Sequence, residues 1–223
     1  MATVAQPKYY DNFNDLPYEG VFEQMENGKW IRLDLDNENI IHDEKDKTFD
    51  RVDEPQSDEI PWVTTAVNLM GTREIRGSRS NSTIMQWAKN IGGWIKNYYK
   101  NDDIPWCGLF VDHLMRSNGI EVNIKNPLSA RAWNAFGMKA TPCPGAVMVF
   151  SRKGGGHVGL YVSEDKNYYH ILGGNQSNSV NVTKVAKNRF LGARWPKEFA
   201  SLYEKNNKRV YKTFDGKVSI NEA

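Results

Sequence analysis

The stretch GAVMVFSRKGGGHVGLYVS (residues 145–163) marks the point where the chain changes from helical to strand periodicity. Residues 145–150 form a continuous apolar run that predicts a buried strand. Residues 156–163 predict a second strand, with Val158, Leu160 and Val162 on one face and His157, Gly159 and Tyr161 on the other. Three later runs, YYHIL (168–172), SVNVTKV (179–185) and FLGARW (190–195), complete a predicted antiparallel meander.

The sequence before this stretch predicts helices. Apolar residues recur at helical spacing in PWVTTAVNLMG (61–71), SNSTIMQWAKNIGGWIKNYY (80–99), WCGLFVDHLMRSNG (106–119) and LSARAWNAFG (128–137). Gly92 and Gly93 weaken the second helix, Gly119 ends the third, and Ser129 is a candidate cap for the fourth. Because helices come first and strands follow without βαβ alternation, the fold class is predicted to be α+β, with N-terminal helices packed on a central antiparallel sheet.

The charge pattern divides the 223 residues. Residues 1–60 carry 6 Lys or Arg and 16 Asp or Glu, so this part is acidic. Residues 61–223 carry 23 Lys or Arg and 11 Asp or Glu, so this part is basic. We therefore expect an acidic appendage and linker over 1–60, with a short hairpin around Asn27-Gly28. A main folded domain is expected over 61–197, and a C-terminal extension over 198–223 with a hairpin at Asp215-Gly216. The basic part could contact an anionic polymer.

Only two cysteines occur, Cys107 and Cys143, and no Cys/His spacing resembles a zinc site. Cys107 follows Pro105-Trp106 at the predicted start of a helix. It is either a buried filler or a nucleophile, because a helix N-terminus and a nearby imidazole both lower the pKa of a thiol. Cys143 lies between two prolines before a strand and is expected to be a buried structural thiol.

A catalytic thiol needs a base, and the chain has four histidines. His42 lies in the acidic linker, His113 faces away from Cys107 on the same predicted helix, and His170 lies mid-strand. His157 opens a strand directly after three glycines, where another backbone can approach, so we predict His157 to be the base.

A third polar group should fix the imidazole. Asn175 lies just past the strand that ends near Leu172, and strand alternation offers Gln176 as the alternative, since only one of the two side chains can point inward. Asn in such a turn also occurs for purely conformational reasons. The order Cys, His, Asn with these placements is the papain-type arrangement.

The motifs PWCGLFV (105–111), GGGHVGLYV (154–162) and LGGNQSNSVNV (172–182) resemble the cysteine/histidine-dependent amidohydrolase/peptidase (CHAP) group, which is related to the NlpC-type cell-wall peptidases. They are most similar to a phage-associated subfamily, as are GTREIRGSRSN (71–81) and LGARWP (191–196). The resemblance covers roughly residues 61–196. It implies a papain-like fold and hydrolysis of peptidoglycan.

In the mechanism that this resemblance implies, Cys107 attacks an amide carbonyl in the peptide stem, the cross-link or the muramoyl-alanine link. His157 accepts the thiol proton, Asn175 holds the ring, and the N–H of Cys107 binds the oxyanion with one more donor. The candidates for contact with substrate or oxyanion are Gln176, Trp106, Tyr98, Tyr99, Asn101, Glu74 and Asn81. For Glu74 and Asn81, helix capping and solvation are equally good readings.

We expect no metal and no cofactor. Asp102 and Asp103 lack the spacing of a calcium loop, and DLDNENIIHDEK (34–45) lacks the Gly and Glu of an EF-hand. Neither a membrane span nor a secretory signal is predicted, so the protein is expected to be made in the cytoplasm and to reach the wall after release, injection or secretion.

Three functions remain in competition. The first is a phage lysin, or, within the same enzyme class, a secreted antibacterial amidase effector with an immunity partner. The second is a non-catalytic wall-binding or structural protein of a phage particle, which the intact Cys, His and Asn disfavour. The third is nucleic-acid binding, which is disfavoured because no helix-turn-helix or RRM-like motif is present.

Overall fold

The structure is a computed structural model that describes residues 9–10, 22–24, 30–32, 59–75, 77, 79–214, 216 and 218. The chain divides into two compact units, residues 1–57 and 58–223. In the first unit, strands β1 (Tyr9–Tyr10), β2 (Phe22–Gln24) and β3 (Trp30–Arg32) form an antiparallel sheet in the order β1-β3-β2. The pairing of β2 with β3 confirms the predicted hairpin. Its turn and the charged linker lie outside the described residues.

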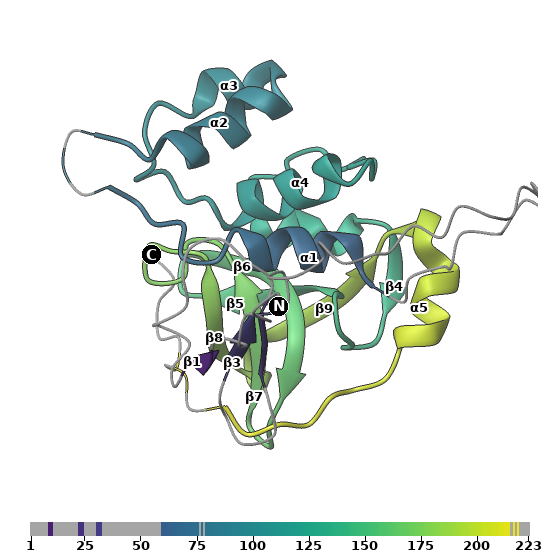
Figure 1. Cartoon of the computed structure of the whole chain (residues 1–223). Helices are drawn as coiled ribbons and strands as arrows, with labels where there is room; N and C mark the ends of the chain where they lie inside the picture. Colours follow the sequence, from purple (N-terminus) through teal and green to yellow (C-terminus); the bar gives the residue numbers. More distant parts are fainter. Residues whose placement is uncertain are drawn as a thin grey trace, which may run out of the picture. The chain divides into compact units, whose positions relative to one another are not determined.

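The second unit is built on a six-stranded antiparallel sheet (Figure 1). Its strands are β4 (Met138–Ala140), β5 (Val147–Arg152), β6 (Gly155–Glu164), β7 (Tyr168–Gly173), β8 (Asn181–Ala186) and β9 (Phe190–Trp195). Their order is β4-β9-β5-β6-β7-β8. Strands β5 to β8 form the predicted meander, whereas β9 returns to the other side of β5 and pairs with β4, a strand that the sequence pattern did not indicate.

The helices α1 (Pro61–Asn68), α2 (Ser82–Ile91), α3 (Gly93–Tyr98) and α4 (Cys107–Ser117) gather on one side of this sheet (Figure 1). Helix α4 packs on β6 and β7, and α1 and α2 pack on α4. A 3-10 helix, η2 (Ala130–Ala135), packs on β5, β6 and β9. The short helices η3 (Lys187–Arg189), η4 (Lys197–Phe199) and α5 (Ala200–Asn206) follow later in the chain. This arrangement confirms the α+β prediction.

Indole rings dominate the core. Trp62, Trp106, Trp133 and Trp195 are fully buried, and the rings of Trp62 and Trp195 meet edge to face at 4.9 Å. Buried indole N–H groups need acceptors. Trp62 donates to the carbonyl of Gly145 at 2.7 Å, and Trp133 donates to that of Pro127 at 2.8 Å. These bonds connect the first helix and η2 to the loops that lead into the sheet and the site.

Local details differ from the sequence prediction. The stretch predicted as one helix over 80–99 is broken where Gly92 and Gly93 adopt positive φ angles of 77° and 53°. A bulge between Tyr161 and Ser163 leaves Val162 37% exposed, although alternation predicted it beside Val158 and Leu160. Ser129 occupies the N-cap of η2 without a side-chain capping bond.

The C-terminal segment pairs with the sheet. Tyr211 forms a parallel bridge with Glu164 and Val218 forms one with Lys184, so these two residues pair with β6 and β8. Asp215, at the predicted hairpin turn, lies outside the described residues.

Candidate active site

Cys107 is the first residue of α4, as predicted, and its side chain is buried among the core residues. The turn before it is fixed by Tyr99, whose hydroxyl donates to the carbonyl of Pro105 at 2.5 Å. Trp106 is the N-cap residue, and its carbonyl accepts the first intrahelical bond from Phe110 at 2.9 Å. A thiol at this position lies at the positive end of an eleven-residue helix, where negative charge is stabilised.

His157 lies in β6 opposite Phe150 of β5 and is fully buried. Its Nε2 atom lies 2.9 Å from Oε1 of Gln176. Gln176 is also buried, with 2% exposure. The residue that holds the imidazole is therefore Gln176, the alternative orienter, and the prediction that Asn175 holds it is wrong.

The surroundings of Gln176 determine which imidazole nitrogen carries the proton. The Nε2 group of Gln176 donates to the carbonyls of Ile171 at 3.0 Å and Asn181 at 2.5 Å, so its Oε1 atom must face His157. An amide oxygen only accepts hydrogen bonds, and His157 must therefore donate from Nε2. In the neutral ring the basic lone pair is then on Nδ1. This is the tautomer that a general base needs when its Nε2 side is held.

Two glycines let the loop after β7 fit between the imidazole and the nucleophile helix. A β-carbon at Gly173 would lie 3.3 Å from Nε2 of His157, and one at Gly174 would lie 2.7 Å from the ring of Trp106 and from Cβ of Phe110. The loop therefore contacts the ring on one side and the first turn of α4 on the other. Since α4 also packs on β6, the start of the Cys107 helix and His157 both lie against the loop between β7 and β8.

Asn175 lies in this loop and contacts residues on the side of the nucleophile helix. With its amide oriented to satisfy both neighbours, it donates to Oε1 of Glu74 at 3.0 Å and accepts from the backbone N–H of Trp106 at 3.3 Å. The same Glu74 oxygen accepts from the indole N–H of Trp106 at 2.7 Å. We call these three residues the Glu74 bracket. Burial raises the pKa of Glu74, although the bond from Trp106 opposes this effect.

Backbone pairing carries Glu74 to this place. The N–H of Gly71 donates to Val180 at 2.9 Å, that of Val180 donates to Thr72 at 2.8 Å, and that of Glu74 donates to Asn178 at 3.0 Å. The segment before α2 thus runs alongside the loop that carries Asn175 and Gln176. Glu74 was among the residues named from the sequence, but this pairing had no sequence signal.

Asn81, the other residue named with Glu74, is a helix cap. Its side-chain oxygen accepts from the N–H groups of Thr83 at 2.8 Å and Ile84 at 3.4 Å, and its amide donates to the carbonyl of Arg73 at 2.8 Å. Buried Asp102 accepts from the backbone of Asn81 at 2.7 Å. Of the two readings of Asn81, capping is the one that the contacts support.

The residues considered for the second oxyanion donor are placed differently. Tyr99 is buried and its hydroxyl proton is directed at Pro105; burial raises its pKa well above the ordinary value, with a smaller contribution from nearby Cys107. Tyr98 and Asn101 are exposed. Tyr99 therefore supports the turn before Cys107.

The other thiol and the other described histidines belong to different surroundings. Cys143 is fully buried, and burial raises its pKa to about 12, so it is protonated at neutral pH. His113 stacks on Trp87 at 5.1 Å. His170 lies between Ser163 and Asp165, at 2.7 and 3.2 Å. His42 lies outside the described residues.

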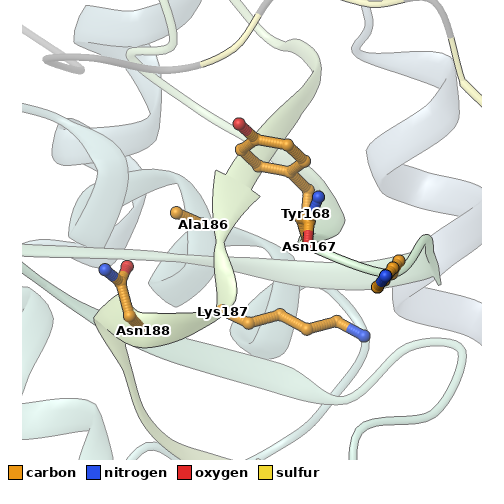
Figure 2. Close-up of a pocket in the computed structure, with 6 residues that line it drawn as sticks. Asn167, Tyr168, Ala186, Lys187 and Asn188 are labelled. Carbon is orange, nitrogen blue, oxygen red and sulfur yellow. The ribbon is translucent and has the colours of Figure 1, made fainter.

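A cavity of about 360 Å³ lies at the turn between β6 and β7 (Figure 2). It is lined by Lys166, Asn167, Tyr168, Ala186, Lys187 and Asn188. None of these is a nucleophile with a base beside it, and the Nζ atom of Lys187 lies 3.4 Å from the buried carboxylate of Glu164.

Within the described ranges, the structure has no group of three or more His, Cys, Asp or Glu side chains suited to a metal ion. Nor does any helix in those ranges have the length and apolar character needed to cross a bilayer. No family model, curated protein or solved structure matches the chain.

Proposed function

We propose that this protein is a papain-like cysteine hydrolase that cleaves an amide bond in peptidoglycan. The observation that carries this proposal is the 2.9 Å contact between His157 and Gln176, with the amide direction fixed, on the loop that also contacts the start of the Cys107 helix. Thiol catalysis requires a histidine held in a fixed tautomer beside a cysteine at a helix start. Here buried His157 of β6 is held by Gln176, and the loop that carries Gln176 also packs against the first turn of the Cys107 helix.

The reaction proceeds through a thioester. Cys107 transfers its proton to Nδ1 of His157, and the thiolate sulfur attacks the amide carbonyl. The N–H groups at the start of α4 stabilise the oxyanion. When the C–N bond breaks, the imidazolium returns its proton to the leaving amine. A water molecule, deprotonated by the same imidazole, then attacks the thioester and releases the acid and the thiol. Gln176 accepts from Nε2 throughout and keeps the ring oriented.

The choice of peptidoglycan rests on the motifs around the three site residues, PWCGLFV, GGGHVGLYV and LGGNQSNSVNV, and on the basic character of residues 61–223. A cationic surface favours approach to an anionic wall polymer. A phage lysin is the role that we favour. A secreted antibacterial amidase effector would use the same chemistry, and genomic neighbours encoding an immunity protein would distinguish it.

Mass spectrometry of fragments released from purified peptidoglycan tests the proposal. The wild type should release soluble fragments whose masses identify the cleaved bond, and Cys107→Ala should release none. Cys143→Ala is the matched control, because it removes the other thiol from outside the site and should retain cleavage. Fragment release by Cys107→Ala at the wild-type rate would contradict the proposal and leave a non-catalytic wall or virion protein contaminated by another hydrolase.

A further inference from the structure

Helix α3 presents two large aromatic side chains to solvent. Trp94 is 49% exposed and Tyr98 is 55% exposed, and their rings meet edge to face at 5.9 Å. They lie four residues apart and therefore share a face of the helix. An exposed pair of this kind presents the flat surfaces that commonly serve recognition.

The double glycine before α3 creates this exposure. Gly92 and Gly93, both with positive φ, end α2 and start a new helix in another direction. Helix α2 buries Ile84, Trp87 and Ala88, whereas α3 buries only Ile95. Local backbone geometry thus presents the Trp94–Tyr98 pair outward.

The pair is continuous with the candidate active site. The ring of Tyr98 lies 6.0 Å from that of Tyr99, edge to face. Tyr99 in turn donates to the carbonyl of Pro105, two residues before Cys107. The rings therefore lead from solvent to the turn that precedes the nucleophile helix.

The segment that carries the two exposed rings has an excess of lysine. Residues 82–101 contain three exposed lysines, Lys89, Lys96 and Lys100, and the acidic residues that follow are buried Asp102 and exposed Asp103. A ligand that fits this surface has flat apolar faces that can stack on Trp94 and Tyr98. It also carries negative charge that the lysines can attract.

We propose that Trp94 and Tyr98 form a subsite for the glycan strand of peptidoglycan, in which sugar rings stack on the aromatic faces and the lysines attract the carboxylates of neighbouring peptide stems. This inference rests on the proposed function, since the amide in the active site is attached to that strand. The C–H faces of pyranose rings suit the negative face of an aromatic ring.

The experiment measures co-sedimentation of the full chain with purified, insoluble peptidoglycan in the Cys107→Ala background, where the wall is not consumed. Adding Trp94→Ala and Tyr98→Ala together should weaken binding by about tenfold. Leu191→Ala, which truncates a 45% exposed side chain on β9, is the matched control and should bind normally. Unchanged unfolding midpoints show that the fold is intact, and Trp94→Phe should retain most of the binding.

Three outcomes overturn the inference. The first is unchanged wall binding by the double variant. The second is equal loss in the Leu191→Ala control. The third is displacement by oligo-dT but not by soluble N-acetylglucosamine oligomers, which would identify single-stranded nucleic acid as the ligand. Failure of the proposed function looks different: the wild type would release no fragments, while the aromatic variants would still lose binding to the wall.

Discussion

Asn175 and Gln176 are neighbours in the chain but serve opposite sides of the site. Gln176 holds His157 and Asn175 contacts Glu74 and Trp106. Three residues of this loop, Asn175, Ser177 and Asn178, have φ angles of 58°, 52° and 63°. Such left-handed residues rotate the following side chain away from strand alternation, so consecutive residues can point to two different partners.

Gln176→Ala should lower kcat about 10²-fold, because the imidazole loses the partner that fixes its tautomer and orientation. KM should change little, since Gln176 faces His157 and the sheet. Initial rates of fragment release from peptidoglycan measure both. Gln86→Ala, on the exposed face of α2, is the matched control. A wild-type kcat in Gln176→Ala, with folding unchanged, would show that the orienter lies elsewhere.

The sequence narrowed the orienter to two adjacent residues, and the choice of Asn175 over Gln176 was wrong. Choosing between Asn175 and Gln176 required strand alternation to continue past β7. The positive φ of Asn175 ends this alternation, so the sequence pattern no longer says which side chain points inward. Cys107 and His157 were easier to single out, because a helix start and a strand start are local features with sequence signals.

Glu74 provides a test that separates hydrogen bonding from charge. Glu74→Ala removes the acceptor for the buried indole N–H of Trp106 and for Asn175, and should lower the free energy of unfolding by about 1–3 kcal/mol. Glu74→Gln keeps an acceptor oxygen and removes a carboxylate whose pKa burial raises. It should therefore be at least as stable as the wild type at pH 7, with the difference shrinking as the pH falls toward 4.5 and below.

Urea unfolding at pH 7 and pH 4 measures both effects. Equal destabilisation by Glu74→Ala and Glu74→Gln would show that charge, and not the acceptor, is what the Glu74 bracket requires. Fragment-release rates should follow the same order, with Glu74→Gln more active than Glu74→Ala, because the bracket contacts the N-cap of α4.

At the scale of elements, α4 approaches the loop before η2 so closely that one position must lack a side chain. A β-carbon at Gly108 would collide with the carbonyl oxygen of Pro127 and would lie 2.7 Å from that of Leu128. Both are backbone atoms. Gly108 therefore allows the first turn of α4, including Cys107, to sit against this loop.

Gly108→Ala should lower the free energy of unfolding by about 1–3 kcal/mol through overpacking, although helix propensity alone would favour alanine by about 1 kcal/mol. The helix start should shift, and fragment release should slow. Thermal unfolding and peptidoglycan cleavage measure the two effects. Gly155→Ala is the control, because its β-carbon would meet nothing closer than Nε of Arg152 at 3.7 Å. A stabilised Gly108→Ala would refute this packing argument.

Periodicity predicted most elements with long, regular patterns: α1, α4 and strands β5 to β9 lie where the sequence placed them. The misses are short elements whose existence depends on distant partners. Strand β4 has three residues and forms only because β9 returns beside β5. The helix predicted over 128–137 is present as η2, but it has 3-10 geometry, and its Trp133 donates to the carbonyl of Pro127.

At the scale of the whole molecule, the segment after β9 belongs to the same compact unit as the site. Glu164 is fully buried in β6 and accepts from Arg209 at 3.2 Å, while its backbone N–H donates to Val210 at 2.8 Å and its carbonyl accepts from Lys212 at 3.0 Å. A buried carboxylate is tolerated because it is paired. The sequence treated residues 198–223 as an extension because no local pattern reveals this pairing.

The same region gives the unit a pH-dependent stability through His170. This imidazole is buried against Ser163 and Asp165, with the ring of Phe214 at 5.1 Å. Burial lowers its pKa below the ordinary 6.5, although Asp165 opposes this effect. As the pH falls through 6.5, the unfolded chain binds a proton that folded His170 does not, and stability is lost by at most about 1.4 kcal/mol per pH unit for this group.

His170→Gln, which can keep bonds to both partners, should therefore flatten the decline in the free energy of unfolding between pH 7 and pH 5. Urea unfolding at half-unit steps measures the slopes. His113 also has a pKa lowered by burial, so His113→Gln should remove a separate part of the slope, and the two effects should add because the residues contact different elements. The free energy of unfolding of His170→Gln and of the wild type could instead decline in parallel. In that case folded His170 binds its proton as readily as the unfolded chain does, and its pKa is not lowered by burial.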